Sequence, residues 1–277
     1  MKKLLQLVIF VFAYLFSLSL YAENNSYITL ETTTDNANGK GYYLGAGIDF
    51  IGASQLMLSY GNNDADTTKT DNYSIGINSD PLASFNTSFS YLFWQQKNEI
   101  DIRTFQLSFN NNTNDWGFSV SPELRMITLY PLSAPAVDTN STGIGVNAAY
   151  YGSFPLFISA GFKFYSYERN LGALNPNQYP LFGMRHFSPA TLDQATGLED
   201  NRFTFDLGYS FTRLTIGYYR ERSTSAVDNS TYTSNSVYGK LNLTDNWQLG
   251  VETGRSKTSL NSADTISFTS ASITYNW

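Results

Sequence analysis

The last seven residues, Ala271-Ser272-Ile273-Thr274-Tyr275-Asn276-Trp277, alternate between apolar and polar side chains without a break. Successive side chains of a β-strand point to opposite faces of the sheet, so this alternation predicts a strand with one apolar and one polar face. The apolar face finishes on two aromatic residues, Tyr275 and Trp277. The chain therefore ends, by this pattern, in an amphipathic strand.

A terminal strand with an aromatic last residue and a tyrosine two positions before it resembles the closing strand of Gram-negative outer-membrane β-barrel proteins. Trp277 stands where that family more often has phenylalanine. The resemblance implies that Tyr275 and Trp277 are a signal read by the barrel assembly machinery. It also implies that the protein resides in the cell outer membrane, in contact with lipid.

The start of the chain has the pattern of an export signal. Two lysines precede an apolar run over residues 8–16, and a more polar stretch ends at Ala22. We expect residues 1–22 to be removed as a signal peptide, leaving residues 23–277 as the barrel domain. A retained membrane anchor on a periplasmic domain is the alternative, and the strand-rich sequence that follows favours the signal peptide.

The composition is unusual for a soluble domain. Only 14% of the 277 residues are charged, against 16% that are aromatic, whereas soluble domains have about a quarter charged residues. Beyond the expected signal, no apolar run approaches the roughly 18 residues of a membrane helix. A chain that is poor in charge, rich in aromatics and free of long apolar runs is typical of strands with one face in lipid.

Alternation like that of the C-terminal strand recurs along the whole chain. The fourteen predicted strands cover residues 27–34, 41–50, 54–60, 71–78, 84–95, 100–110, 115–130, 141–151, 155–167, 202–211, 213–222, 231–243, 246–254 and 265–277. The first half of residues 100–110 is out of phase, which we interpret as a bulge or the outer rim.

The predicted connections alternate between short and long. Tight turns such as 51–53 and 244–245 join every second pair of strands, and longer polar connections such as 62–70 and 131–140 join the others. Short turns at one end and longer loops at the other are typical of bacterial outer-membrane barrels. With both termini at the short-turn end the strand number is even. Fourteen satisfies this, and twelve or sixteen stay open.

We therefore predict an all-β fold, a transmembrane antiparallel up-and-down β-barrel of about fourteen strands. An antiparallel β-sandwich or a lectin-like periplasmic protein is the alternative, but it would bury its apolar faces between two sheets. Aromatic residues near strand ends, among them Tyr42, Trp116 and Trp247, favour the barrel because aromatic girdles mark the membrane interfaces. In size and strand number the chain resembles small monomeric porins.

Ten residues are predicted to line the lumen, because they lie on the polar faces of the strands. They are Asp49, Glu123, Arg125, Lys163, Asp206, Arg213, Tyr219, Glu221, Lys240 and Glu252. Arg202 lies on the same face and makes the charges five of each sign, which predicts a hydrated and weakly selective lumen. A plugged barrel whose charges pair only to hold its shape would use the same residues.

The connection over residues 170–201 is several times longer than its neighbours and rich in apolar residues. Such a loop is usually functional or packed against something. Folding into the lumen as a constriction and packing across the mouth or against a partner are both open. The only histidine, His186, lies here without an oriented acid, so we do not expect an enzyme such as the barrel phospholipases.

These patterns predict a porin-like diffusion channel for small hydrophilic solutes. A non-conducting structural, receptor or adhesin barrel is the alternative. A single histidine and no cysteine predict neither a metal site nor a cofactor. Without the two lysines of the signal, 15 basic and 23 acidic residues leave a net charge of −8. This charge argues against nucleic acid as a partner and allows at most a slight cation preference.

Overall fold

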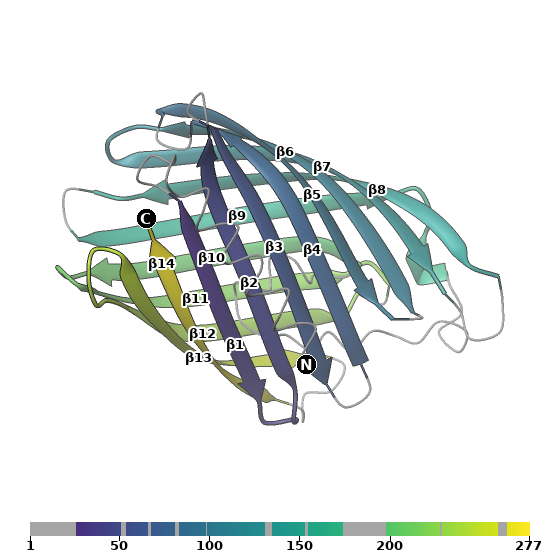
Figure 1. Cartoon of the computed structure of the whole chain (residues 1–277). Helices are drawn as coiled ribbons and strands as arrows, with labels where there is room; N and C mark the ends of the chain where they lie inside the picture. The colour runs from purple at the N-terminus through teal and green to yellow at the C-terminus, as the bar shows by residue number, and fades with distance from the viewer. Residues whose placement is uncertain are drawn as a thin grey trace.

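The structure is a computed structural model that describes residues 26–50, 54–65, 68–80, 83–97, 99–130, 135–152, 155–173, 198–227, 229–259 and 265–277. The expected signal over residues 1–22 lies outside the described residues, as does most of the long connection, including His186. Within these ranges the chain forms one closed barrel of fourteen antiparallel strands (Figure 1). The predicted fold class and strand number are confirmed.

Each strand pairs with its neighbours in the sequence, and β1 pairs with β14 to close the barrel. The strands are β1 (Tyr27–Asp35), β2 (Lys40–Phe50), β3 (Ser54–Ala65), β4 (Thr68–Ser79), β5 (Phe85–Gln96), β6 (Ile100–Asn112), β7 (Trp116–Leu129), β8 (Val137–Tyr150), β9 (Leu156–Tyr167), β10 (Glu199–Ser210), β11 (Leu214–Ser225), β12 (Thr231–Asn242), β13 (Trp247–Thr258) and β14 (Ile266–Asn276).

The C-terminal strand closes the barrel, as its resemblance to the closing strand of outer-membrane barrel proteins implies. Tyr27 of β1 stands opposite Asn276 of β14, and the backbone N–H of Trp277 donates to the carbonyl of Ser26 at 3.0 Å. The first described residue and the last residue therefore meet at one end of the barrel, which we call the turn rim. The opposite end, which holds the connection between β9 and β10, is the loop rim.

Connection lengths differ less than the sequence suggests. Several strands extend beyond their predicted ends: β3 and β4 pair as far as Ala65↔Thr68, inside the expected loop over 62–70. The Nζ of Lys69 and the Oδ2 of Asp64 form an ion pair across this extension at 2.8 Å. All connections therefore have two to seven residues, except the 31 residues between β9 and β10. The predicted alternation of short turns with longer loops is therefore wrong for most connections, because the loops at the loop rim are about as short as the turns at the turn rim. The predicted up-and-down topology is confirmed.

The outer surface of the barrel is apolar. Every strand carries at least one exposed large hydrophobic side chain, such as Ile75, Phe89, Leu107 and Val251. Stacked or tilted ring pairs such as Trp116–Tyr150 lie at the turn rim. An exposed apolar surface that encircles the whole barrel is stable only in lipid, so the barrel crosses a membrane.

Within the described residues, no helix has the length and hydropathy needed to span a membrane.

Candidate functional site

The interior of the barrel is polar and hollow. Buried inward side chains are mostly Ser, Thr, Asn, Gln and charged residues. Three chambers of about 260, 330 and 510 Å³ lie along the inner wall. Gln106 and Lys163 line both the first and the second chamber, while Asp206 and Tyr219 line both the second and the third. The chambers are thus neighbouring parts of one lumen.

An ion network of six buried or half-buried side chains covers one wall of this lumen. Its members, on β7, β9, β10 and β11, are Glu123, Arg125, Lys163, Glu199, Arg202 and Glu221. Lys163 Nζ lies 2.7 Å from Glu123 Oε1, and Arg125 Nη2 lies 3.1 Å from Glu199 Oε1. Arg202 Nε lies 2.9 Å from Glu199 Oε2. These six described side chains comprise three carboxylates and three cations, so their charges sum to zero.

A tyrosine and a glycine complete the network between β7 and β9. Tyr165 donates to Glu123 Oε2 at 3.0 Å, and the guanidinium of Arg125 lies 3.7 Å from the centre of its ring. The strand between them, β8, has Gly143 opposite Tyr165. A Cβ on Gly143 would lie 2.5 Å from the Tyr165 ring. Glycine therefore gives the ring the space to lie across β8 and reach Glu123.

The same device recurs around the lumen. In-register pairs of an inward glycine and an inward aromatic residue are Gly47–Tyr27, Gly143–Tyr165, Gly208–Phe157, Gly217–Tyr238 and Gly254–Phe268. In each pair the ring occupies the place of the missing Cβ. The rings lie along the wall instead of projecting across the barrel, which keeps the lumen open despite many aromatic side chains.

A second charged group lines the largest chamber. Glu31, Asp206 and Glu252 contribute three carboxylates from β1, β10 and β13, and Lys240 contributes one ammonium from β12. Tyr238 donates to Asp206 Oδ1 at 2.9 Å. With the ion network, these described lumen residues comprise six carboxylates and four cations. Among the described residues these two groups therefore have two more carboxylates than cations, whereas the residues predicted from the sequence have five of each sign.

The ion network reaches the long connection through Glu199. A register shift between Glu199 and Asn201 marks a β-bulge at the start of β10. The bulge directs Glu199 inward, where its side chain is fully buried. Tyr167 at the end of β9 donates to the Glu199 carbonyl at 2.5 Å. Both ends of the long connection are therefore fixed inside the barrel wall.

Apolar side chains fill part of the mouth at the loop rim. This mouth cluster consists of Trp94, Ile100, Ile102, Ile127, Leu129, Leu171 and Leu198. Leu171 belongs to a single 3₁₀ turn, η2 (Leu171–Ala173), and Leu198 immediately precedes β10. Both leucines are nearly fully buried against inward residues of β5, β6 and β7. The described ends of the long connection thus lie inside the mouth and narrow it.

The mouth cluster explains the phase change predicted near residue 100. Ile100 and Ile102 face inward because they pack on Leu171 and Leu198. The β5–β6 register runs without a shift from Gln96↔Ile100 to Phe85↔Asn111. The first half of residues 100–110 therefore contains no bulge in its pairing with β5. Its change of phase comes from its position at the rim, which is the other interpretation given above.

The ten sequence-predicted lumen residues divide by position. Glu123, Arg125, Lys163 and Glu221 lie in the ion network. Asp206, Tyr219, Lys240 and Glu252 line the largest chamber. Asp49 lies near the turn rim and accepts from Gln55 Nε2 at 3.0 Å. Arg213 is exposed in the turn before β11, outside the strand to which the sequence assigned it.

Two carboxylates that face the lumen, Glu31 and Glu199, are not among the ten predicted residues. Glu31 alternates with Leu30 on β1, so the period of two was sufficient to find it. Glu199 gives no such signal, because the bulge shifts the phase of the strand before Asn201.

The predicted assembly signal lies on the outer face at the turn rim. The Tyr275 ring packs 4.7 Å from the Trp247 ring and 5.8 Å from the Trp277 ring, measured between centroids. Both Tyr275 and Trp277 pack on the buried cluster of Ile28, Ala46 and Ile48. Among the described residues, no group of three or more His, Asp or Glu side chains is arranged to hold a metal ion.

No protein-family model and no curated protein sequence matches the chain. Solved structures do match it. The CymD monoaromatic hydrocarbon channel aligns with a TM-score of 0.55 over 92% of this chain and 89% of its own, at 6% identity. The NanC porin aligns with a TM-score of 0.50 over 90% of this chain and 100% of its own, at 7% identity. The predicted resemblance to porins is confirmed at the level of the fold.

Proposed function

We propose that this chain is a porin-like diffusion channel of the outer membrane that passes small hydrophilic solutes. The observation that carries the proposal is the hollow polar lumen, with three neighbouring chambers of about 260, 330 and 510 Å³. Fourteen strands enclose more space than eight, which are filled by their own side chains. The glycine–aromatic pairs preserve that space.

Three further observations support the proposal. The fold is shared with a porin and with a channel. The apolar outer surface suits outer-membrane lipid as the surrounding solvent. Tyr275 and Trp277 are half-buried on the outer face at the turn rim, and this position supports their proposed recognition by the barrel assembly machinery.

The mouth cluster favours a second candidate, a non-conducting barrel that displays its loops as a receptor, an adhesin or a structural element. Leu171 and Leu198 occupy part of the mouth, and a fully blocked mouth would leave no path for solutes. The two candidates differ in one measurable property, ion conduction.

The excess of lumen carboxylates predicts a preference for cations. Under a KCl gradient across a planar bilayer, we expect the reversal potential to show a K⁺/Cl⁻ permeability ratio above one. The double variant Glu31→Gln/Glu252→Gln should bring the ratio toward one, because both residues line the largest chamber. Asp138→Asn is the matched control, since it removes a carboxylate from an exposed residue of β8.

Each outcome is informative. A wild-type protein that inserts but carries no current contradicts the channel proposal and favours the non-conducting barrel. Current without a cation preference, or equal effects of the double variant and Asp138→Asn, contradicts the assignment of these carboxylates to the conducting path.

A further inference from the structure

Four basic side chains face outward on β11 and β13. They are Arg220 and Arg222 of β11 and Arg255 and Lys257 of β13, and all four are exposed. Glu221, between the two arginines of β11, is fully buried in the lumen, so the arginines point to the opposite, lipid-facing side of the wall. The same alternation places the two cations of β13 on the outer face. We call these four residues the basic patch.

The register of the strands brings the basic patch together. β12 lies between β11 and β13 in the wall of the barrel (Figure 1). Asn235 of β12 stands opposite Arg220 on one side and Arg255 on the other. The neighbouring outward residue of β12 stands between Arg222 and Lys257 in the same way. Two strand spacings, about 10 Å, separate the cations across β12, so their long side chains can reach a common ligand.

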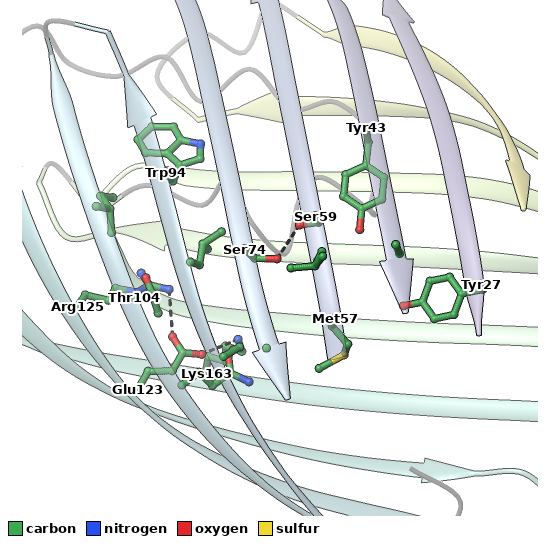
Figure 2. A pocket seen from close by; sticks show the side chains of 17 residues that line it. Tyr27, Tyr43, Met57, Ser59, Ser74, Trp94, Thr104, Glu123, Arg125 and Lys163 are labelled. Atoms are coloured by element: carbon green, nitrogen blue, oxygen red, sulfur yellow. Dashed lines mark hydrogen bonds and ion pairs between the residues drawn. The ribbon is translucent and has the colours of Figure 1, made fainter. Parts of the chain in front are cut away.

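The basic patch has no carboxylate partner in the part of the chain that the structure describes. None of its four cations forms an ion pair there, and the described outward residues of β11, β12 and β13 include no carboxylate. The lumen cations differ, because Figure 2 shows Arg125 and Lys163 both joined to Glu123. Like charges that gather on one face repel each other, so an anion from outside these strands would stabilise the patch.

The basic patch lies next to the apolar outer surface of the same strands. Ile216 of β11, Val237 of β12 and Val251 of β13 are exposed on the outer face. β11 and β13 run toward the loop rim, and Arg220 and Arg255 follow Ile216 and Val251 by four residues. A change from apolar to basic side chains is expected where acyl chains give way to headgroups. The anion found at that depth is the phosphate of a membrane lipid.

The donors of the basic patch suit a phosphate group. Each arginine can bind phosphate through two parallel N–H groups, a geometry that a lysine ammonium does not offer. Asn235 adds a neutral donor between Arg220 and Arg255, because Tyr218 donates to its Oδ1 at 2.8 Å and leaves the Nδ2 hydrogens for another acceptor. The patch therefore combines charge with directed hydrogen-bond donors.

We propose that the basic patch binds the phosphate group of an anionic lipid in the leaflet at the loop rim. The acyl chains of that lipid cover the exposed side chains of Val237 and Val251. This inference goes beyond the proposed channel function and does not depend on it, since a non-conducting barrel with the same outer face would bind the same lipid.

Native mass spectrometry of the folded barrel in detergent measures the binding of single lipids. We expect dimyristoylphosphatidic acid to bind with a Kd about tenfold lower than dimyristoylphosphatidylcholine, which has the same acyl chains but a cationic headgroup. Arg220→Gln/Arg255→Gln and Arg222→Gln/Lys257→Gln should each raise the Kd of the phosphatidic acid about tenfold, because charged hydrogen bonds are lost. Arg220→Lys/Arg255→Lys should raise it less, because the charge remains and only the paired donors are lost.

Arg103→Gln/Lys240→Gln is the matched control, since it removes the same charge from exposed residues outside the basic patch. It should leave the Kd unchanged, and heat-modifiable migration in gels checks that every variant is folded. Equal Kd values for the two lipids, or an unchanged Kd in both glutamine double variants of the patch, would overturn the site. Displacement of the bound lipid by an excess of inorganic phosphate would overturn the lipid assignment, because it would show an anion site that needs no acyl chain.

Discussion

Replacing Arg202 with methionine is expected to lower the free energy of unfolding by about 3–5 kcal/mol, the cost of leaving buried charges uncompensated. Arg202 is 1% exposed. It donates to both carboxylate oxygens of Glu199 at 2.9 Å, and its Nε lies 3.8 Å from Glu221 Oε1. A urea titration of the barrel refolded in phospholipid vesicles, followed by tryptophan fluorescence, measures this loss.

The double variant Arg202→Met/Glu221→Gln restores a neutral network of two carboxylates and two cations among the described members. It should therefore be more stable than Arg202→Met alone. Lys240→Met removes an exposed lumen cation and should change stability by no more than about 0.5 kcal/mol. If Arg202→Met is no less stable than Lys240→Met, the ion network contributes nothing to holding β7, β9, β10 and β11 together.

The second large effect is expected on the outer face. Phe162 points outward from β9, where its ring packs 4.8 Å from that of Phe164 and 5.6 Å from that of Phe203. Phe162 lies in the middle of β9, so Phe162→Arg places a charge deep in lipid and should cost about 2–4 kcal/mol. The same vesicle titration measures the difference.

Ser159→Arg is the matched control on the same strand. Ser159 lines a chamber of the lumen and stands opposite Asp206 in the register of β9 and β10, so an arginine there meets water and a carboxylate. We expect this variant to unfold close to the wild-type urea concentration. Equal destabilisation by Phe162→Arg and Ser159→Arg would contradict the assignment of the two faces.

Alternation was sufficient to predict the strands and their faces because lipid and water act on every residue of a barrel wall. Residues 155–167 illustrate this: Phe162 is outward and Lys163 inward, as their alternation indicates. The ion pairs of the network could not be predicted from the sequence. Which charged side chains come into contact depends on the stagger between strands, and alternation does not give that stagger. Glu123 and Lys163, for example, lie on β7 and β9, separated by Gly143 and Gly145 of β8.

The remaining errors arise where alternation ends. Glu199 faces inward only because of a β-bulge, and Arg213 lies in a turn one residue before its strand begins. Ile100 and Ile102 are apolar residues on the inward, otherwise polar face of β6. They pack inside the mouth against Leu171 and Leu198 of the long connection. In each case a tertiary contact, or the end of a strand, overrides the local pattern.

Single-channel recording in planar lipid bilayers tests the central claim most directly. The purified barrel should produce discrete conductance steps. Replacing residues 170–198 with a short Gly-Ser turn should make these steps larger, because Leu171 and Leu198 no longer occupy the mouth. Protein that is folded by its heat-modifiable migration, yet carries no current with or without this connection, would contradict the channel and identify the barrel as a non-conducting one.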